Sequence, residues 1–438
     1  MQRHILKALI QWKDRTDRLP LLLRGARQVG KTYIIEHFGK TYFNDLVTIN
    51  LELQPALKSC FNTLQPAQII QAIEIELQQS IEAGKTLLFI DEIQECPAAI
   101  QALRYFKEQY PELHVIAAGS LLEFALNDAE FSLPVGRIEF LFLYPLSFSE
   151  FLWALGDQKL HEYLSHLQLT DTIPESIHLK ALERLKLYLL LGGMPAVVQS
   201  YIDNHDLLRC QQLQAFVLNT YRGDFGKYAH IVNPQYCQRV FEKAPNLVAK
   251  KFKYIDVDPA IQSRELKKAV TALRLAGVIQ PVYLSKATGL PLNASIHEKD
   301  FKLLFLDVGL VKYASRIDAN ILLSEDVLLV NHGAIAEQFV GQELIAHQPS
   351  FDQAELFYWH KEQNKGSAEV DYIIQHKNHI IPLEVKAGKT GRLKSLQIFM
   401  QEKNSPMGIK ISQDNFGYEH NILSLPLYMI AELSRLLG

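Results

Sequence analysis

The feature that most constrains the fold of this chain is a complete glycine-rich motif, G-x-x-x-x-G-K-[ST], near the N-terminus. The apolar pattern predicts a strand at residues 19–23, directly before the motif, and a helix at 32–38 directly after it. Glycines let such a loop curl, so that its backbone N–H groups face an anion at the start of a helix. The residues expected to bind the phosphates of ATP are Gly25, Ala26, Arg27, Gln28, Val29, Gly30, Lys31 and Thr32.

Two residues of the motif and two acids further along the chain have expected roles in catalysis. Lys31 is expected to reach the β- and γ-phosphates, and Thr32 to place its hydroxyl on Mg²⁺. Asp91 and Glu92 follow a buried apolar strand at 86–90, which places them beside the phosphate loop. Asp91 is predicted to hold Mg²⁺ directly or through water, and Glu92 to polarise the attacking water. The alternative for this acidic pair is an ordinary loop after a strand.

Ser120 and Arg137 are further candidate site residues, and each also has a purely structural interpretation. Ser120 follows a strand at 114–118, where it either senses the γ-phosphate or caps a helix at 121–126. Arg137 is either an arginine finger, acting within its own chain or on a neighbouring copy, or a surface ion-pair residue.

The first 155 residues alternate short, nearly continuous apolar runs with helix-like stretches. Such runs are typical of strands buried on both faces, so this region is predicted to be a three-layer α/β fold with a parallel sheet, as in P-loop NTPases. The predicted strands are 19–23, 46–51, 86–90, 114–118 and 137–143, and the predicted helices include 67–83 and 98–110.

The region from 156 to 330 is predicted to be mostly helical. Residues 263–277 form an amphipathic pattern with a serine start and a glycine stop, and a strand at 278–284 follows. A helix, a glycine stop and a β-ribbon are the order found in a winged helix. Its basic residues either contact DNA or belong to a module that only packs against protein. These residues are Arg264, Lys267, Lys268 and Arg274.

The region from 331 to 438 is predicted to be a further α/β module with a second group of reactive side chains. Its helix is expected at 334–347, and its strands at 356–360, 369–375 and 379–385. Asp371 lies on one strand, and Glu384 and Lys386 end the next, so that a hairpin would bring the three side chains together.

These side chains have the chemistry of a metal site. Asp371 and Glu384 would hold a second divalent metal, Mg²⁺ or Mn²⁺, and Lys386 would orient a water or stabilise charge on a phosphate. Glu337 or Glu343, on the preceding helix, would supply another ligand or position the lysine. Lysine and arginine residues at 389, 392 and 394 make a local basic patch suited to phosphate backbones. The alternative is a salt-bridged structural cluster or an inactive remnant.

Composition excludes several classes of function. The formal net charge is -3, so any binding of nucleic acid must depend on a local basic patch. The longest apolar stretch, 187–198, is interrupted by Gly192, Gly193 and Pro195 and is too short to span a bilayer. The four cysteines are far apart and form no CxxC pair. We therefore expect a cytoplasmic protein with no membrane segment and no disulfide framework.

Taken together, these motifs resemble the bacterial and archaeal predicted ATPases that combine an AAA-type core with a C-terminal domain of unknown function (DUF4143). The resemblance covers nearly the whole chain. It implies an AAA-type core at 1–155, a helical lid and winged-helix-like region at 156–330, and a module at 331–438 that is similar to PD-(D/E)xK nucleases. The nuclease-like positions would be Glu337, Asp371, Glu384 and Lys386. The matching stretches are 24–32, 89–94, 135–137, 144–151, 192–195, 306–310, 337–340, 369–371 and 383–386.

Two functions are compatible with these motifs. The leading hypothesis is an ATP hydrolase whose nucleotide state controls a DNA-directed, metal-dependent nuclease module. The alternative is a nucleotide-switched scaffold whose C-terminal domain is catalytically inactive and only binds a partner. Assembly into a homo-oligomer is compatible with both hypotheses.

Overall fold

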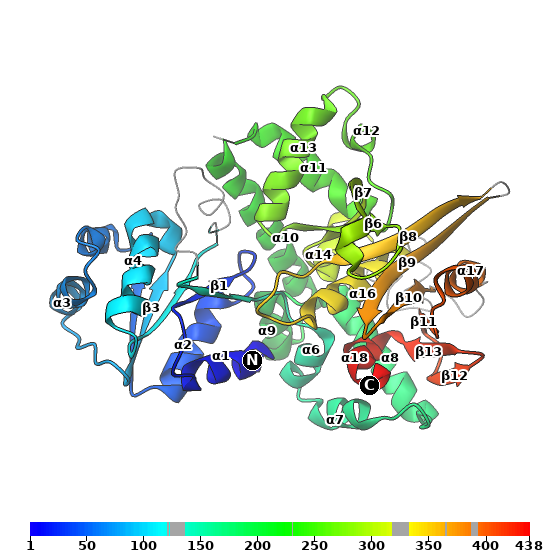
Figure 1. Cartoon of the computed structure of the whole chain (residues 1–438), viewed down its shortest axis with the longest axis horizontal. Helices are drawn as coiled ribbons and strands as arrows, with labels where there is room; N and C mark the ends of the chain where they lie inside the picture. Colours follow the sequence, from blue (N-terminus) through cyan, green and yellow to red (C-terminus); the bar gives the residue numbers. More distant parts are fainter. Residues whose placement is uncertain (121, 123–135, 230, 318–332, 364–365, 387–392) are drawn as a thin grey trace.

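The computed structural model describes residues 1–120, 122, 136–229, 231–317, 333–363, 366–386 and 393–438. Its N-terminal part is built on a five-stranded sheet with the order β2-β3-β4-β1-β5, drawn in blue and cyan in Figure 1. All neighbouring strands are parallel, as the continuous apolar runs predict. The strands are β1 (Leu21–Arg24), β2 (Asp45–Asn50), β3 (Thr86–Asp91), β4 (His114–Ala118) and β5 (Glu139–Phe142).

Alternate side chains of this sheet face different pairs of helices. Leu21 and Leu23 pack in one core with α1 (Ile5–Asp14) and α2 (Lys31–Tyr42), whereas Leu22 joins a second core with α3 and α4. The predicted three-layer architecture is therefore confirmed. The other helices of this part are η1 (Pro55–Phe61), α3 (Pro66–Leu77), η2 (Ile93–Glu95) and α4 (Pro97–Gln109).

One predicted helix ends earlier than its pattern suggests. The sequence predicts a helix to residue 83, but α3 stops at Leu77 because Gln78 takes a left-handed conformation with φ of 53°. The backbone N–H of Ile81 then donates to the carboxylate of Glu74 at 2.7 Å, and Ile81 still reaches the core. Ile81 is therefore buried, as its helical spacing suggests, although the helix has already ended.

The middle of the chain is mostly helical, as expected. Among the described residues no single helix is long and apolar enough to cross a membrane, and α8 and α9 meet that length and composition only as a pair bent by 120°. The helices are α6 (Phe148–Ala154), α7 (Gln158–His166), α8 (Glu175–Leu191), α9 (Pro195–Asn204), α10 (Leu207–Asp224), η3 (Phe225–Tyr228), α11 (Pro234–Leu247), α12 (Tyr254–Val257), α13 (Ser263–Leu275) and α14 (Val308–Ala314).

A mixed eight-stranded sheet forms the rest of the molecule, with the order β12-β13-β11-β10-β9-β8-β6-β7. Strands β6 and β7 form an antiparallel ribbon directly after α13, and β6 pairs in parallel with β8. Strands on both sides of residue 330 therefore share one sheet. The strands are β6 (Ile279–Ser285), β7 (Ile296–Phe305), β8 (Leu356–Gln363), β9 (Gly366–His376), β10 (His379–Val385), β11 (Gly408–Ser412), β12 (Gly417–Glu419) and β13 (Ile422–Pro426).

The middle and C-terminal parts also share one hydrophobic core, which extends from Leu146 to Leu436. Helix α16 lies between the middle helices and the eight-stranded sheet (Figure 1), and residues on all its sides are buried in this core. A helix buried in this way contacts several elements at once and so connects them. The remaining helices are η4 (Leu292–Ser295), α16 (Ala334–Ala346), α17 (Lys394–Lys403), η6 (Leu427–Glu432) and α18 (Leu433–Leu437).

Candidate nucleotide site and C-terminal carboxylate cluster

The glycine-rich loop joins β1 to α2 in the conformation that its sequence requires. Gly25 has φ of 144°, and a Cβ at this position would lie 2.2 Å from the carbonyl oxygen of Leu143, so only glycine fits. Gly30 precedes α2 in the left-handed conformation. The Lys31 ammonium donates to the carbonyl oxygens of Gly25 and Ala26 at 2.8 and 2.9 Å, which curls the lysine back over its own loop.

The residues proposed to hold Mg²⁺ lie together at the carboxyl end of β3. The Thr32 hydroxyl donates to Oδ2 of Asp91 at 2.9 Å. Burial raises the pKa of Asp91, and the hydrogen bond from Thr32 acts in the opposite direction. A hydroxyl and a carboxylate beside a phosphate loop fit Mg²⁺, which usually takes one or two protein oxygens and completes its shell with phosphate and water.

Glu92 is also at this edge and is held by hydrogen bonds. Its Oε2 accepts from the Gln94 side-chain amide at 2.7 Å, and from both the backbone N–H and the hydroxyl of Ser120 at 3.1 Å. Burial favours the neutral acid, but these donors outweigh it and lower the pKa of Glu92, so that the carboxylate is ionised at neutral pH. Ser120 comes from the neighbouring strand β4, as the sequence predicts, whereas Gln94 was not singled out.

Arg137 has a partner on the protein surface. Its guanidinium lies 3.1 Å from Glu108 of α4, and its side chain is 49% exposed. Arg137 is thus a surface ion-pair residue in this structure, and its role as an arginine finger stays a prediction. The helix expected at 121–126, with Ser120 as its cap, falls largely outside the described residues.

Comparison with known proteins bears on this nucleotide site. Residues 17–152 match the AAA domain. The chain carries an AAA-type ATPase domain. The AAA domain contains the glycine-rich loop and the strand edge with Asp91 and Glu92, so ATP binding and hydrolysis are functions of this part of the chain.

The other comparisons describe the rest of the chain without assigning a function to it. Residues 182–320 match a domain of unknown function (DUF8612), and residues 332–428 match a second one (DUF4143). No curated protein matches the chain. A solved structure, the Walker-type ATPase PABY2304 of Pyrococcus abyssi, is similar at 16% identity over 71% of this chain and 94% of that chain, with a TM-score of 0.44. A likeness of this size carries no argument about function.

Outside the AAA domain, the side chains predicted as nuclease-like converge around a lysine that the sequence did not indicate. Lys302 of β7 lies 3.3 Å from Glu337, 2.6 Å from Glu369 and 3.5 Å from Asp371. Burial disfavours the ammonium, but attraction to the surrounding carboxylates raises the pKa of Lys302 well above its ordinary value. The cluster therefore already contains a buried cation.

The hairpin of β9 and β10 places the other predicted residues next to this lysine. Asp371 accepts a hydrogen bond from the backbone N–H of Val385 at 2.9 Å, and Lys386 lies 2.6 Å from Oε1 of Glu384. The second oxygen of Glu384 is buried and has no hydrogen-bond partner among the described residues. Burial raises the pKa of Asp371 and of Glu384.

In this arrangement the carboxylates of the cluster are paired with lysines, and the second metal stays a prediction. Within the described ranges, no three His, Cys, Asp or Glu side chains are grouped closely enough to hold a metal ion. Glu337 takes part in the cluster, whereas Glu343 points away from it and accepts from the backbone N–H of Phe148 at 2.8 Å. Of the predicted basic patch, Lys394 starts α17, and Lys389 and Arg392 lie outside the described residues.

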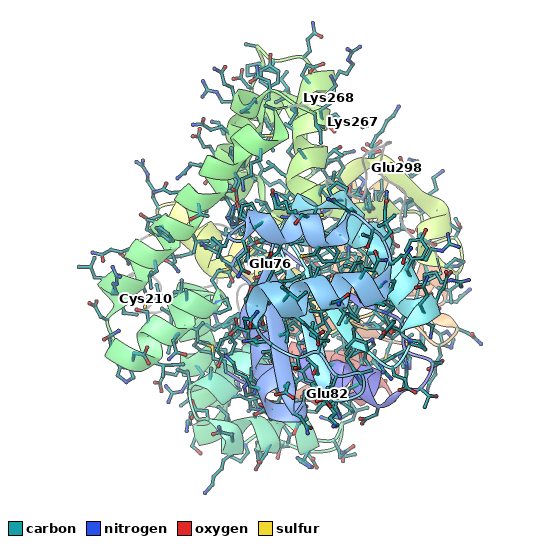
Figure 2. All side chains as sticks on the ribbon, turned by 90° about the vertical axis from the view of Figure 1, so that its left-hand side faces the viewer. Glu76, Glu82, Cys210, Lys267, Lys268 and Glu298 are labelled. Atoms are coloured by element: carbon teal, nitrogen blue, oxygen red, sulfur yellow. The ribbon has the colours of Figure 1, made fainter. Side chains whose placement is uncertain are left out.

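The exposed face of α13 borders a groove of about 800 Å³ that runs along the β6–β7 ribbon. Lys267 and Arg274 line this groove together with Glu298, and Figure 2 shows Lys267 and Lys268 on α13 near Glu298. Glu265 pairs with Lys268 at 3.2 Å and with Arg264 at 3.5 Å, so the basic face is partly neutralised.

Proposed function

We propose that the AAA domain binds ATP with Mg²⁺ through the loop at 25–32 and hydrolyses it with Glu92 as the catalytic base. The observation that carries this assignment is the placement of Thr32, Asp91 and Glu92 at one sheet edge beside the loop. Thr32 and Asp91 would hold the Mg²⁺, which supplies positive charge to the phosphates. An ionised Glu92 can accept a proton from the attacking water, and Ser120 contacts the same carboxylate from β4.

The test of this site is calorimetry with ATP and Mg²⁺ on the wild-type chain and on Lys31→Ala. We expect the variant to lose most of its affinity for ATP, because the ammonium is the main charged donor to the phosphates. Unchanged affinity in Lys31→Ala would overturn the site assignment.

We further propose that the nucleotide state is transmitted to the C-terminal domain. Two direct links support this proposal. The backbone N–H of Phe148, at the start of α6, donates to Glu343 of α16 at 2.8 Å, and Phe142 of β5 donates to the carbonyl of Ser350 at 2.7 Å. Helix α16 also carries Glu337, so one element connects the edge of the AAA domain to the carboxylate cluster.

The function that this geometry supports best is a nucleotide-switched scaffold with a partner-binding C-terminal domain. The observation that favours it over the nuclease is Lys302, whose ammonium lies 3.5 Å from Asp371, one of the two carboxylates predicted to hold the metal. An ammonium so close to Asp371 repels a divalent cation at that carboxylate, which weighs against a metal-dependent step.

A DNA-directed, metal-dependent nuclease is the second candidate. It is favoured by the convergence of Asp371, Glu384 and Lys386, and by the lysines and arginines along the α13 groove, which suit a phosphate backbone. The test is cleavage of plasmid DNA with Mg²⁺ or Mn²⁺ by the wild type, Asp371→Ala and Lys386→Ala. Cleavage by the wild type alone would establish the nuclease, and equal products from all three would remove it.

A further inference from the structure

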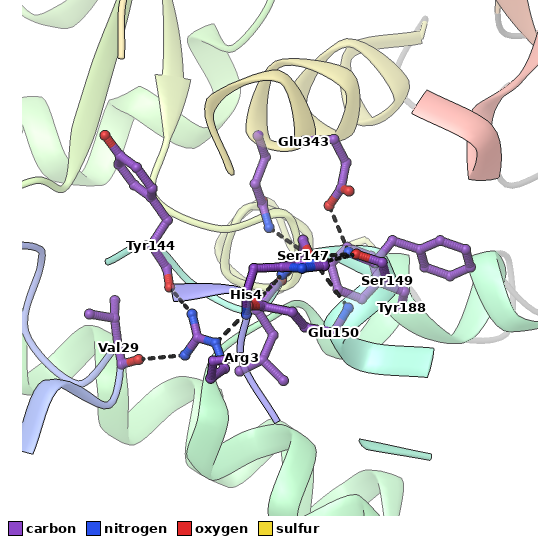
Figure 3. Close-up of polar contacts among 12 residues, drawn as sticks. Arg3, His4, Val29, Tyr144, Ser147, Ser149, Glu150, Tyr188 and Glu343 are labelled. Carbon is purple, nitrogen blue, oxygen red and sulfur yellow. Dashed lines mark hydrogen bonds and ion pairs between the residues drawn. The ribbon is translucent and has the colours of Figure 1, made fainter. Parts of the chain in front are cut away.

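Two carbonyl groups of the phosphate loop are held from outside the AAA domain. The Tyr221 hydroxyl donates to the carbonyl oxygen of Arg27 at 2.6 Å, and the Arg3 guanidinium donates to the carbonyl oxygen of Val29 at 3.1 Å. Tyr221 belongs to α10 and Arg3 precedes α1, so both lie outside residues 17–152. Figure 3 shows the Arg3 side chain between Val29 and Tyr144.

The planarity of the peptide bond gives these two contacts a consequence for phosphate binding. In a trans peptide the carbonyl of one residue and the N–H of the next point in opposite directions. Holding the carbonyls of Arg27 and Val29 on the outer side of the loop therefore turns the N–H groups of Gln28 and Gly30 to the other side. Backbone N–H groups on the inner side of such a loop are the donors that bind phosphate oxygens.

The backbone at these positions needs support. Gln28 has φ of 64° and Gly30 has φ of 95°, both in the left-handed region. For a residue with a Cβ, such as Gln28, this conformation persists only where surrounding contacts determine it. The contacts from Tyr221 and Arg3 are made to the residues directly before these two positions.

Both supporting side chains are themselves fixed. Arg3 is 6% exposed, lies 3.0 Å from the Glu150 carboxylate and donates to the carbonyl of Tyr144 at 2.6 Å. Tyr221 is 2% exposed, and Asp224, one turn further along α10, forms an ion pair with the Arg27 side chain. The loop is therefore held by two side chains that are themselves anchored outside it.

We propose that Arg3 and Tyr221 are positioning residues for the phosphate loop, which orient the N–H donors of Gln28 and Gly30 toward the phosphates of ATP. The inference rests on the proposed role of this loop in ATP binding. It extends the nucleotide site to the N-terminal segment and to α10, neither of which touches the nucleotide in this scheme.

The sharpest test is Tyr221→Phe, which removes one hydroxyl and leaves the ring in its core. Because the oriented donors bind phosphate in the ground state and in the transition state alike, we expect the KM for ATP to rise about fivefold while kcat at saturation changes by less than about twofold. Arg3→Ala is expected to raise KM about tenfold, and Arg3→Lys to restore part of the loss.

Two matched controls separate positioning from general destabilisation. Tyr428→Phe also removes a buried tyrosine hydroxyl, which bonds His178 at 2.8 Å, and Lys7→Ala changes an exposed cation on α1. Both should leave KM unchanged even where the melting temperature falls. A loss of folded protein alone would lower kcat at constant KM, and that result would overturn the proposal.

Comparison with Lys31→Ala separates the positioning role of Arg3 and Tyr221 from the nucleotide site itself. If Lys31→Ala abolishes ATP binding while Tyr221→Phe and Arg3→Ala keep the wild-type KM, the positioning role is wrong and the site stands. If all variants, including Lys31→Ala, bind ATP as the wild type does, both assignments are wrong.

Discussion

The Glu92 carboxylate is the residue on which hydrolysis is expected to depend. It is ionised and held by Ser120 and Gln94, at the edge that also carries Asp91. Glu92→Gln keeps the shape and removes the base, so we expect ATP turnover to fall by about 10²- to 10⁴-fold while ATP affinity is retained. Steady-state hydrolysis and calorimetry measure the two effects. Glu95→Gln, at the end of the 3₁₀ helix that follows Glu92, is the control and should hydrolyse normally. Turnover by Glu92→Gln equal to that of the wild type would exclude the base role.

Glu343 gives a prediction about pH. Burial raises its pKa from an ordinary 4.5 to about 8, so the folded protein keeps a proton that the unfolded chain releases. The stability contributed by this proton is complete below about pH 4.5 and is lost as the pH rises through 8, at about 1.4 kcal/mol per pH unit in this window.

Glu343→Gln removes this dependence. Relative to the variant, the wild type should therefore lose stability between pH 5 and pH 8, as measured by the midpoints of urea unfolding. Glu419→Gln changes an exposed carboxylate and should show no such trend. A constant difference between the wild type and Glu343→Gln across this range would contradict the buried, protonated state.

At the scale of single elements, strand β7 determines the state of the carboxylate cluster. Its Lys302 is buried among three carboxylates, whereas Lys299 on the same strand is exposed. Lys302→Met should lower the free energy of unfolding by about 3–5 kcal/mol, because it leaves buried carboxylates without a cation.

The control for this prediction is Lys299→Met, with an expected change within about 0.5 kcal/mol. Part of the loss in Lys302→Met should be recovered at low pH, where the carboxylates are protonated. Equal stability of the two variants in urea unfolding would show that Lys302 does not pair with the cluster.

Helix α16 shows where sequence patterns stop being informative. The sequence predicts its position within one residue, but left open whether Glu337 or Glu343 joins the cluster. The helix is buried on every side, so its apolar pattern has no preferred face. Glu337 reaches Lys302 and Glu343 reaches Phe148 only because different elements pack on different sides of α16.

At the scale of the whole molecule, the hydrogen bonds of Phe148 with Glu343 and of Phe142 with Ser350 predict that ATP binding stabilises more than the AAA domain. With ATP at about a hundred times its Kd, binding raises the free energy of every unfolding event that destroys the site by about 2.7 kcal/mol. We expect slower hydrogen exchange in α16 and β10 as well as in β1 and β3.

Hydrogen exchange followed by mass spectrometry checks this prediction, and Lys31→Ala with ATP serves as the control that should show no change. Protection confined to the first 155 residues would mean that the C-terminal part opens independently. The proposed transmission of the nucleotide state would then lack a physical basis.

The sequence by itself determined the features that depend on neighbouring residues. The loop at 25–32, the acids after β3, the bounds of α13 and the hairpin carrying Asp371 and Glu384 follow from spacing, turn chemistry and apolar pattern, which act over a few residues. A lysine in a glycine-rich loop and an acid at the end of a strand need no distant partner to be recognised.

Only the tertiary structure decided which distant side chains complete these sites. Tyr221 lies 194 residues from the carbonyl it holds, and Lys302 lies 35 residues from Glu337. Neither the joining of β6 and β7 to the C-terminal sheet nor the burial of Arg3 against the phosphate loop has a local signature. Such contacts arise when separate elements pack to bury apolar surface, and the polar partners inside that packing are fixed by its geometry and not by their own sequence context.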